Sequence, residues 1–150
     1  ILQGLKELGY ATVAAGENDL RFPPDYLVGQ FSEGDGIPLG GFLTACNVVL
    51  FDSPELGMPK PYRVVEANGV KIGVTAVVGA SVAASVAPPG IESQLRIRPA
   101  VEALRETLPK LAAEGPQLLV LMSHGNLAEA EALAKEFPEF TVILTAGGAE

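Results

Sequence analysis

The alternation of apolar and polar residues at the start of the chain predicts a helix followed by a strand. Ile1, Leu5 and Leu8 share one face of a helix. Gly9 follows, and glycine is suited to the left-handed conformation in which helices often end. The apolar run ATVAAG, residues 11–16, then predicts a short buried strand. A helix joined to a strand by so short a link is typical of α/β architecture.

Two stretches rich in small residues and proline flank the next apolar run. Residues 17–41 contain many glycines and prolines, so we expect mostly loop there, with one helical turn at 25–31. Residues 42–51, FLTACNVVLF, predict a buried strand. Residues 79–98 are small and contain prolines, and we expect them to be irregular.

The segment YRVVEANGVKIGVTAVVG predicts a β-hairpin. Asn68 and Gly69 favour a type I′ turn between two β-rich runs. This register places Glu66 opposite Lys71, a favourable cross-strand pair. The second strand is apolar on both faces over residues 74–78, as expected of a strand in the interior of a sheet.

Two helix–strand units are predicted in the last third of the chain. Pro99 is well placed to begin a helix over residues 99–115, which Pro109 is expected to kink or divide. The apolar run QLLVLMSH then predicts a buried strand. Asn126 and Glu129 have the spacing of a capping box, so the next helix should start directly after that strand. A last strand, TVILTAGG, follows.

Length and composition are those of one folded α/β domain with some antiparallel pairing. The 150 residues are 48% hydrophobic, and their mean hydropathy of +0.31 excludes extended disorder. No apolar run reaches the roughly 18 residues that span a bilayer. The sequence opens inside a helical pattern without Met and closes just after a strand. We therefore interpret residues 1–150 as one domain from a longer polypeptide.

Charge and cysteine content exclude several classes of function. The net charge of −8 disfavours binding to nucleic acids or anionic membranes, because phosphate contacts need clustered Lys and Arg. A single cysteine, Cys46, excludes an internal disulfide and any C-x-x-C motif in these residues. Its apolar surroundings predict a buried, unreactive thiol.

Polar or glycine-rich sequence follows three of the predicted strands: AAGENDL, LMSHGN and LTAGGAE. Ligands of open α/β sheets bind at the carboxyl ends of the strands, and if these three segments lie side by side they form one rim. Glu17 and Asp19 are candidates to bind a hard cation or to act as a general base, with Asn18 as a neutral partner. His124 is a candidate metal ligand. The alternatives are that Asp19 caps a loop and that His124 binds backbone at a helix start.

Four phrases of the sequence carry a family resemblance: LKELGYATVAAGENDL, FLTACNV, PYRVVEANGVKIGVTAVVG and LLVLMSHGNLAEAEALAKEFPEFTVILTAGG. They resemble four features of the calcineurin-like metallophosphoesterases. The first phrase resembles the helix–strand unit before that family's G-N-H-[E/D] motif, and the second resembles a strand of the form flsaNv. The third resembles a hairpin containing N-G-x-K-I-G-V, and the fourth a segment of the form vvvLsHxg…vPgiDvIlgGHtH. The resemblance is to the branch that contains the 5′-nucleotidases, and it spans essentially the whole chain.

This resemblance implies a four-layer α/β/β/α sandwich, incomplete at the N-terminus, with a two-metal phosphoesterase site at the strand ends. The departures fall on the site. Glu17 takes the position of the family's metal-binding Asn, and Asn18 takes that of its catalytic His, while Asp19 keeps an acidic residue. His124 matches a metal-ligand histidine. The final G-H-x-H has no counterpart, and the D-x-H and G-D motifs would lie upstream of residue 1.

These departures lead to three hypotheses. The first is a degenerate, non-catalytic domain that acts as a binding or scaffold module of a larger exported protein, periplasmic or extracellular. Its partners would be the neighbouring domains of that protein and a small phosphorylated ligand. The second is an active phosphomonoesterase or 5′-nucleotidase that uses a divalent metal (Mn, Zn, Fe or Ca), with further ligands upstream. The third is an unrelated α/β domain that binds a small ligand without metal.

Overall fold

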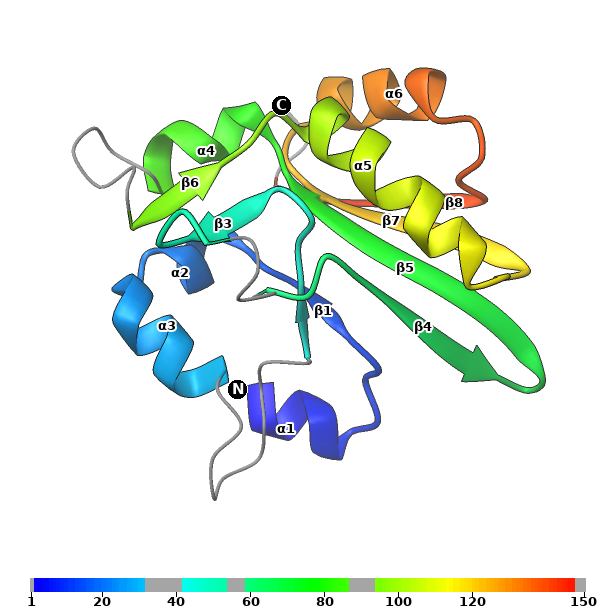
Figure 1. The fold of residues 1–150 in the computed structure, drawn as a ribbon, viewed down its shortest axis with the longest axis horizontal. Coiled ribbons are helices and arrows are strands. Elements are labelled where there is room, and N and C mark those ends of the chain that lie inside the picture. The colour runs from blue at the N-terminus through cyan, green and yellow to red at the C-terminus, as the bar shows by residue number, and fades with distance from the viewer. Residues whose placement is uncertain (1, 32–41, 54–58, 87–93, 148–150) are drawn as a thin grey trace.

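The computed structural model describes residues 2–31, 42–53, 59–86 and 94–147, which form a mixed α/β fold (Figure 1). The helices in these ranges are α1 (Leu2–Glu7), α2 (Glu17–Leu20), α3 (Pro24–Phe31), α4 (Ala80–Val86), α5 (Ala100–Ala113) and α6 (Leu127–Glu136). The strands are β1 (Val13–Ala14), β2 (Leu43–Thr44), β3 (Val48–Leu50), β4 (Tyr62–Ala67), β5 (Val70–Val78), β6 (Leu95–Ile97), β7 (Leu118–His124) and β8 (Val142–Ala146). No helix among the described residues is long and apolar enough to span a membrane.

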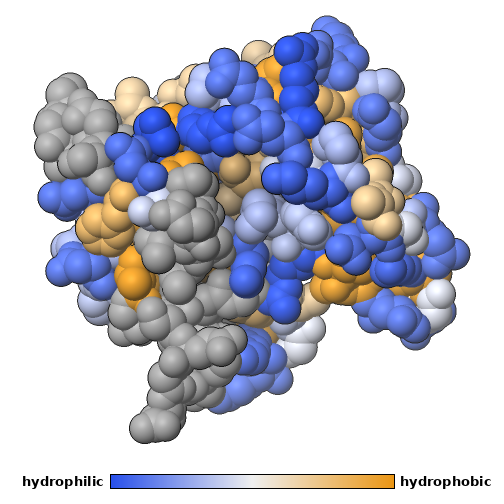
Figure 2. All heavy atoms as spheres, in the orientation of Figure 1, coloured by the Kyte–Doolittle hydropathy of each residue, from blue (hydrophilic) through white to orange (hydrophobic). Residues whose placement is uncertain are grey.

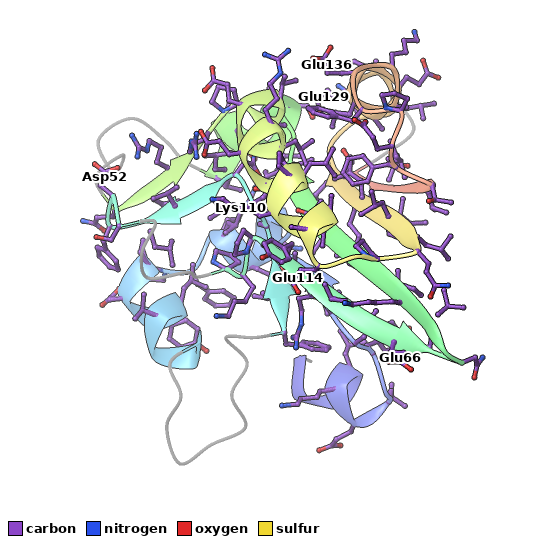
Figure 3. All side chains as sticks on the ribbon, turned by 45° about the vertical axis from the view of Figure 1, so that its right-hand side comes forward. Asp52, Glu66, Lys110, Glu114, Glu129 and Glu136 are labelled. Atoms are coloured by element: carbon purple, nitrogen blue, oxygen red, sulfur yellow. The ribbon has the colours of Figure 1, made fainter. Side chains whose placement is uncertain are left out.

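The largest sheet has the strand order β4-β5-β7-β8, with β4 antiparallel to β5 and the other pairs parallel. The β4–β5 hairpin confirms the predicted turn, because Asn68 and Gly69 both have positive φ values, 51° and 78°. Glu66 is paired with Lys71, as predicted. In Figure 3, Glu66 lies near the hairpin tip, at the opposite end of this sheet from Glu129 in α6.

Helices α5 and α6 cover one face of the four-stranded sheet. An apolar cluster lies between these helices and the sheet: Val77, Leu104, Leu108, Leu121, Leu133, Phe137 and Phe140. The opposite sides of the two helices carry charged residues, and Figure 2 shows a mostly hydrophilic surface where they lie. The predicted capping box begins α6: the Asn126 side chain accepts a hydrogen bond from the Glu129 N–H at 2.9 Å. Helix α6 thus begins three residues after β7 ends.

A second apolar core joins the short strands to the remaining helices. It contains residues from β2 and β3, from α2, α3 and α4, and from the end of β5: Ala15, Leu20, Leu27, Leu43, Ala45, Val48, Leu50, Val78, Val82, Val86 and Leu95. Among the described residues the short strands form two pairs, β1–β2 parallel and β3–β6 antiparallel. Because β1 also contacts β5 and β7, the order of layers is helix, sheet, short strands, helix, which agrees with the expected α/β/β/α arrangement.

Four predictions about local structure were wrong. Residues 17–20 and 80–86 are helical, and 95–97 form a strand, where loop or irregular structure was expected. Pro109 lies inside α5 and does not divide it, and the predicted kink stays a prediction. Because proline has no backbone N–H, one helical hydrogen bond is missing, the one that residue 109 would donate to the carbonyl of Arg105. Both residues are exposed, so water can bind that carbonyl instead. Residues 32–41 and 87–93 lie outside the described residues.

The fourth error concerns residues 42–51, which form two strands of different sheets, not one. The strands are separated at Asn47, whose side chain is fully buried. Its amide nitrogen donates to the carbonyls of Val78 at 2.8 Å and Arg98 at 2.9 Å, and its oxygen accepts from the Val78 N–H at 2.9 Å. The Asn47 side chain therefore links the end of β5 to the segment after β6 through hydrogen bonds.

We expect Asn47→Ala to lower the free energy of unfolding by about 2–4 kcal/mol, because it leaves the buried backbone groups of Val78 and the partly buried carbonyl of Arg98 without partners. Asn47→Asp should be at least as harmful, since a carboxylate cannot donate to two carbonyls. Urea unfolding of the purified protein measures both. Asn18→Ala, at an exposed asparagine, is the matched control and should change stability by less than about 0.5 kcal/mol.

Candidate functional site

The structure brings two of the predicted strand ends, those after β1 and β7, into direct contact. The backbone N–H of Glu17 donates to Nε2 of His124 at 3.2 Å. The third strand end lies alongside, because the N–H of Gly125 donates to the carbonyl of Ala146 at 2.9 Å. The predicted rim therefore exists as a continuous edge from Gly16 to Gly147. Residues 148–150 lie outside the described residues.

His124, the last residue of β7, points away from α5 and α6 toward the loop after β1. Its ring is half-buried, and a Cβ placed on Gly16 would stand 3.5 Å from its Cε1 atom. Because Nε2 accepts the hydrogen bond from Glu17, this geometry assigns the ring proton of neutral His124 to Nδ1. The ring nitrogen that faces the rim thus already has a partner in backbone.

Glu17, the first residue of α2, has a carboxylate that is bound on two sides. Its Oε1 atom pairs with Arg21 at 2.5 Å, one helical turn along, and accepts from the Ser85 hydroxyl of α4 at 3.1 Å. The side chain remains 35% exposed. The hydrogen bond from Ser85, and then that from Arg21, lower the pKa of the Glu17 carboxyl below its ordinary value. The carboxylate is therefore ionised and already neutralised by Arg21.

Asp19 and Asn18 have different surroundings from Glu17. The Oδ2 atom of Asp19 accepts from the backbone N–H of Gly16 at 2.9 Å, so Asp19 caps the start of α2. This is the structural alternative that the sequence left open for Asp19. Asn18 is exposed to solvent. The structure thus places Glu17 and His124 together, with Asp19 beside Gly16 and Asn18 on the surface.

Glu129 is a rim residue that sequence reasoning assigned only to a helix cap. Its Oε1 accepts from the Ser81 N–H at 2.8 Å, and its Oε2 accepts from the Ser81 hydroxyl at 2.6 Å and from the Asn126 N–H at 3.1 Å. A Cβ on Gly79 or Gly125 would overlap this carboxylate. Glu129 therefore joins the start of α6 to the start of α4. The capping-box spacing was a signal for the bond to Asn126, but not for the bonds to Ser81.

Opposing influences act on the Glu129 carboxyl. Burial raises its pKa, while the hydrogen bonds from the Ser81 hydroxyl and from the backbone of Ser81, Asn126 and Ala80 lower it; the hydrogen bonds prevail, so the pKa lies below its ordinary value. The hydrogen bonds of the folded chain thus stabilise the ionised form of the Glu129 carboxyl.

A cavity of about 420 Å³ adjoins the Glu17 side of the rim. Arg21, Ser85 and Gln94 provide its polar groups, and its apolar walls come from Leu20, Phe22, Pro23, Pro24, Val86 and Leu95. Arg21 and Ser85 also hold Glu17, so the cavity and the rim share these two side chains. Its size and mixture of apolar and polar lining are in the range of small-molecule sites.

The described residues do not fit a two-metal centre. Within them, no group of three or more His, Cys, Asp or Glu side chains is placed to hold a metal ion. A dinuclear site holds its ions roughly 3.5–4 Å apart and needs several such ligands. Cys46 is only partly buried, not fully buried as predicted. Burial nevertheless raises the pKa of its thiol to about 11, which makes it a poor metal ligand and agrees with the predicted low reactivity. The roles of Glu17 and His124 as metal ligands stay predictions.

We expect Glu129→Gln to lower the free energy of unfolding by about 1–3 kcal/mol at neutral pH, because an amide accepts these hydrogen bonds less strongly than a carboxylate. A lowered pKa in the folded state adds stability that is present above the unfolded value of 4.5 and is lost as pH falls below it. The difference between the two proteins should therefore shrink below about pH 4.5. Urea unfolding at several pH values measures it.

Glu131→Gln, at an exposed position of α6, is the matched control and should show no such pH-dependent difference. An equal effect of the two substitutions would contradict a specific role for the Glu129 carboxylate.

Comparison with models of known protein families gives no match, and neither does comparison with curated protein sequences. Solved structures do match. The calcineurin-like phosphoesterase YfkN from Bacillus subtilis is 22% identical, with a TM-score of 0.72 over 96% of this chain and 46% of that chain. The sulfate thiohydrolase SoxB from Thermus thermophilus is 20% identical, with a TM-score of 0.69 over 96% of this chain and 25% of that chain.

A 5′-nucleotidase precursor, also from Thermus thermophilus, is 21% identical, with a TM-score of 0.66 over 98% of this chain and 27% of that chain. The chain thus spans between a quarter and a half of the length of these solved chains. At such identities the likeness concerns the fold, and it argues against an unrelated α/β architecture. The chain has the fold of the calcineurin-like phosphoesterases and 5′-nucleotidases, the superfamily that its sequence resembles.

Proposed function

We propose that this chain is a metallophosphoesterase-fold domain without phosphoesterase activity, which acts as a binding or scaffolding module of a larger exported protein. The observation that carries the proposal is that the candidate metal ligands already have partners. Nε2 of His124 accepts the Glu17 N–H, and the Glu17 carboxylate binds Arg21 and Ser85. A metal ion would have to displace these partners and find further ligands outside the described residues.

The residue at the position of the family's catalytic histidine supports the same conclusion. Asn18 is exposed, and its amide cannot donate a proton to a leaving alkoxide near neutral pH as an imidazolium can. Asp19 is the acidic neighbour, but its carboxylate caps α2. Neither side chain is therefore available for acid catalysis in the arrangement that the structure shows.

The cavity beside Arg21 and Ser85 supports a binding role. Its apolar walls suit a small organic group, and Arg21, a fork of N–H donors, suits a phosphate or carboxylate at the mouth. Such an anion would compete with Glu17 for Arg21. We therefore assign a small phosphorylated ligand to this cavity. The family resemblance supports export of the parent protein, and one protein of the same fold bears the description precursor.

The proposal predicts that the purified protein holds well below one Mn, Zn or Fe ion per chain and does not hydrolyse p-nitrophenyl phosphate above background. Elemental analysis and a colorimetric assay measure the two quantities. Two metal ions per chain, with turnover that His124→Ala abolishes, would instead establish the alternative, a metal-dependent phosphomonoesterase or 5′-nucleotidase with further ligands upstream.

Metal addition provides an independent readout on stability. A site that binds a cation with a dissociation constant one hundred times below the added concentration would raise the free energy of unfolding by about 2.7 kcal/mol. We expect Mn²⁺ or Zn²⁺ to leave the urea midpoint of the purified protein unchanged. A rise that is present in the native protein and absent from His124→Ala would contradict the proposal even without a known substrate.

A further inference from the structure

A second cavity, of about 380 Å³, lies between the second half of α5 and the end of α6, which lie side by side on one face of the four-stranded sheet (Figure 1). Its floor is apolar and consists of Leu108 of α5, Leu119 of β7 and Phe137, the residue after α6. All three pack in the apolar cluster between the helices and the sheet. The volume is in the range of small-molecule sites. We name this space the helix cavity.

The helix cavity is separate from the rim of strand ends. Leu119 and His124 both belong to β7, but they are five positions apart, so their side chains point to opposite faces of the sheet. A strand rises about 3.3 Å per residue, which places the two residues about 16 Å apart along β7. A small molecule in the helix cavity would therefore contact neither His124 nor Glu17.

The charged side chains that line the helix cavity are two carboxylates and one guanidinium. The Arg105 guanidinium on α5 pairs with the Glu136 carboxylate on α6 at 2.5 Å, and this pair joins the two helices beside the cavity. The carboxylate of Glu139 is exposed, and among the described residues it takes part in no ion pair. The positive charge of Arg105 is thus neutralised, whereas the negative charge of Glu139 is not.

A backbone acceptor adds to this excess of negative charge. Pro109 has no N–H, so the carbonyl of Arg105 lacks the helical hydrogen bond that residue 109 would donate, and both residues line the helix cavity. The groups that remain able to bind a ligand are therefore acceptors, namely this carbonyl and the Glu139 carboxylate. A group that complements them must donate hydrogen bonds and carry positive charge, as an ammonium does.

We propose that the helix cavity binds a small organic cation, a protonated amine attached to an apolar body. The apolar body would contact the floor, and the ammonium would bind Glu139 and the carbonyl of Arg105. An anion fits less well, because it would have to take Arg105 from Glu136 and would still lie near Glu139. The cavity beside Arg21 differs in this respect, since no carboxylate lines it. The proposal goes beyond the proposed function and does not depend on it.

Fluorescence titration of the purified protein with tryptamine tests the proposal. The chain contains no Trp, so indole emission comes from the added compound alone, and its anisotropy rises when it is bound. The comparison compounds are 3-ethylindole, which is neutral, and indole-3-propionate, which is anionic. We expect saturable binding of tryptamine that is at least about ten times tighter than binding of either comparison compound, because only the ammonium gains charge-assisted hydrogen bonds.

Replacement of the unpaired carboxylate tests its role directly. Glu139→Gln keeps the shape of an exposed side chain and removes its charge, so it should weaken tryptamine binding about three- to tenfold and leave 3-ethylindole unaffected. Glu131→Gln removes the same charge from an exposed position of α6 outside the cavity, and it is the matched control. Its affinity for tryptamine should equal that of the native protein.

An arginine placed in the wall tests the location. Ala112→Arg adds bulk and positive charge to the lining and should weaken tryptamine binding at least about tenfold. Ala113→Arg is the matched control, because Ala113 is the next residue of α5 and does not line the cavity. Both alanines are exposed and arginine is a good helix former, so both variants should fold.

Three results would overturn the proposal: no saturable binding of tryptamine, equal affinity for the three indoles, or tryptamine binding that Ala112→Arg leaves unchanged. Inorganic phosphate provides a further arm of the test. An excess of phosphate should not displace tryptamine, and displacement would mean that the amine occupies an anion site instead. Whether phosphate itself binds beside Arg21 concerns the proposed function only, so the two proposals can fail separately.

Discussion

Where β5, β7 and β8 end, their backbones approach each other closely, and this packing constrains everything around the candidate site. A Cβ on Gly147 would stand 2.9 Å from the carbonyl oxygen of Gly125, and a Cβ on Gly125 would stand 3.2 Å from the Cα of Gly79. The first separation is shorter than a real Cβ contact and Gly147 has a φ of 134°, so a side chain there would be strained, while one at Gly125 would force its neighbours to shift. The space above Gly79 and Gly125 holds the Glu129 carboxylate, which satisfies N–H groups of the two segments that follow the strands.

The hydrogen-bonding needs of a very short helix explain the partners of the remaining rim residues. The first N–H groups of any helix have no acceptor within it, and α2 has only four residues with which to meet this need. His124 accepts the N–H of Glu17, and Asp19 accepts that of Gly16. Two residues that the sequence marks as candidate ligands thus take part in holding α2 against the end of β7. Folding and metal binding would compete for the same lone pairs.

The sequence predicted those elements whose signals are local. The turn at Asn68 and Gly69, the capping box of α6 and the buried strand β5 follow from two or three neighbouring residue types, and the structure confirms them. The grouping of strand ends into one rim also followed, because parallel strands end at one edge.

Elements that depend on distant partners were missed. The break between β2 and β3 is produced by bonds from Asn47 to Val78 and Arg98, 31 and 51 residues away. Helix α4 begins where Ser81 binds Glu129, 48 residues away. No local pattern encodes such pairs. The same limit applies to the site: the sequence named Glu17 and His124, but not the side chains of Arg21 and Ser85 that bind Glu17.

The glycines at the strand ends also restrict how this domain can change in evolution. A side chain introduced at Gly79 or Gly125 would displace the Glu129 carboxylate and so break its hydrogen bonds to Ser81, which join α6 to α4. New chemistry at this edge would have to arise at Glu17 or Asn18, which lie beside the glycine-lined strand ends, or be supplied by polypeptide from elsewhere. Because close backbone packing occupies the strand ends themselves, reactive side chains at this edge have to come from the adjacent segments.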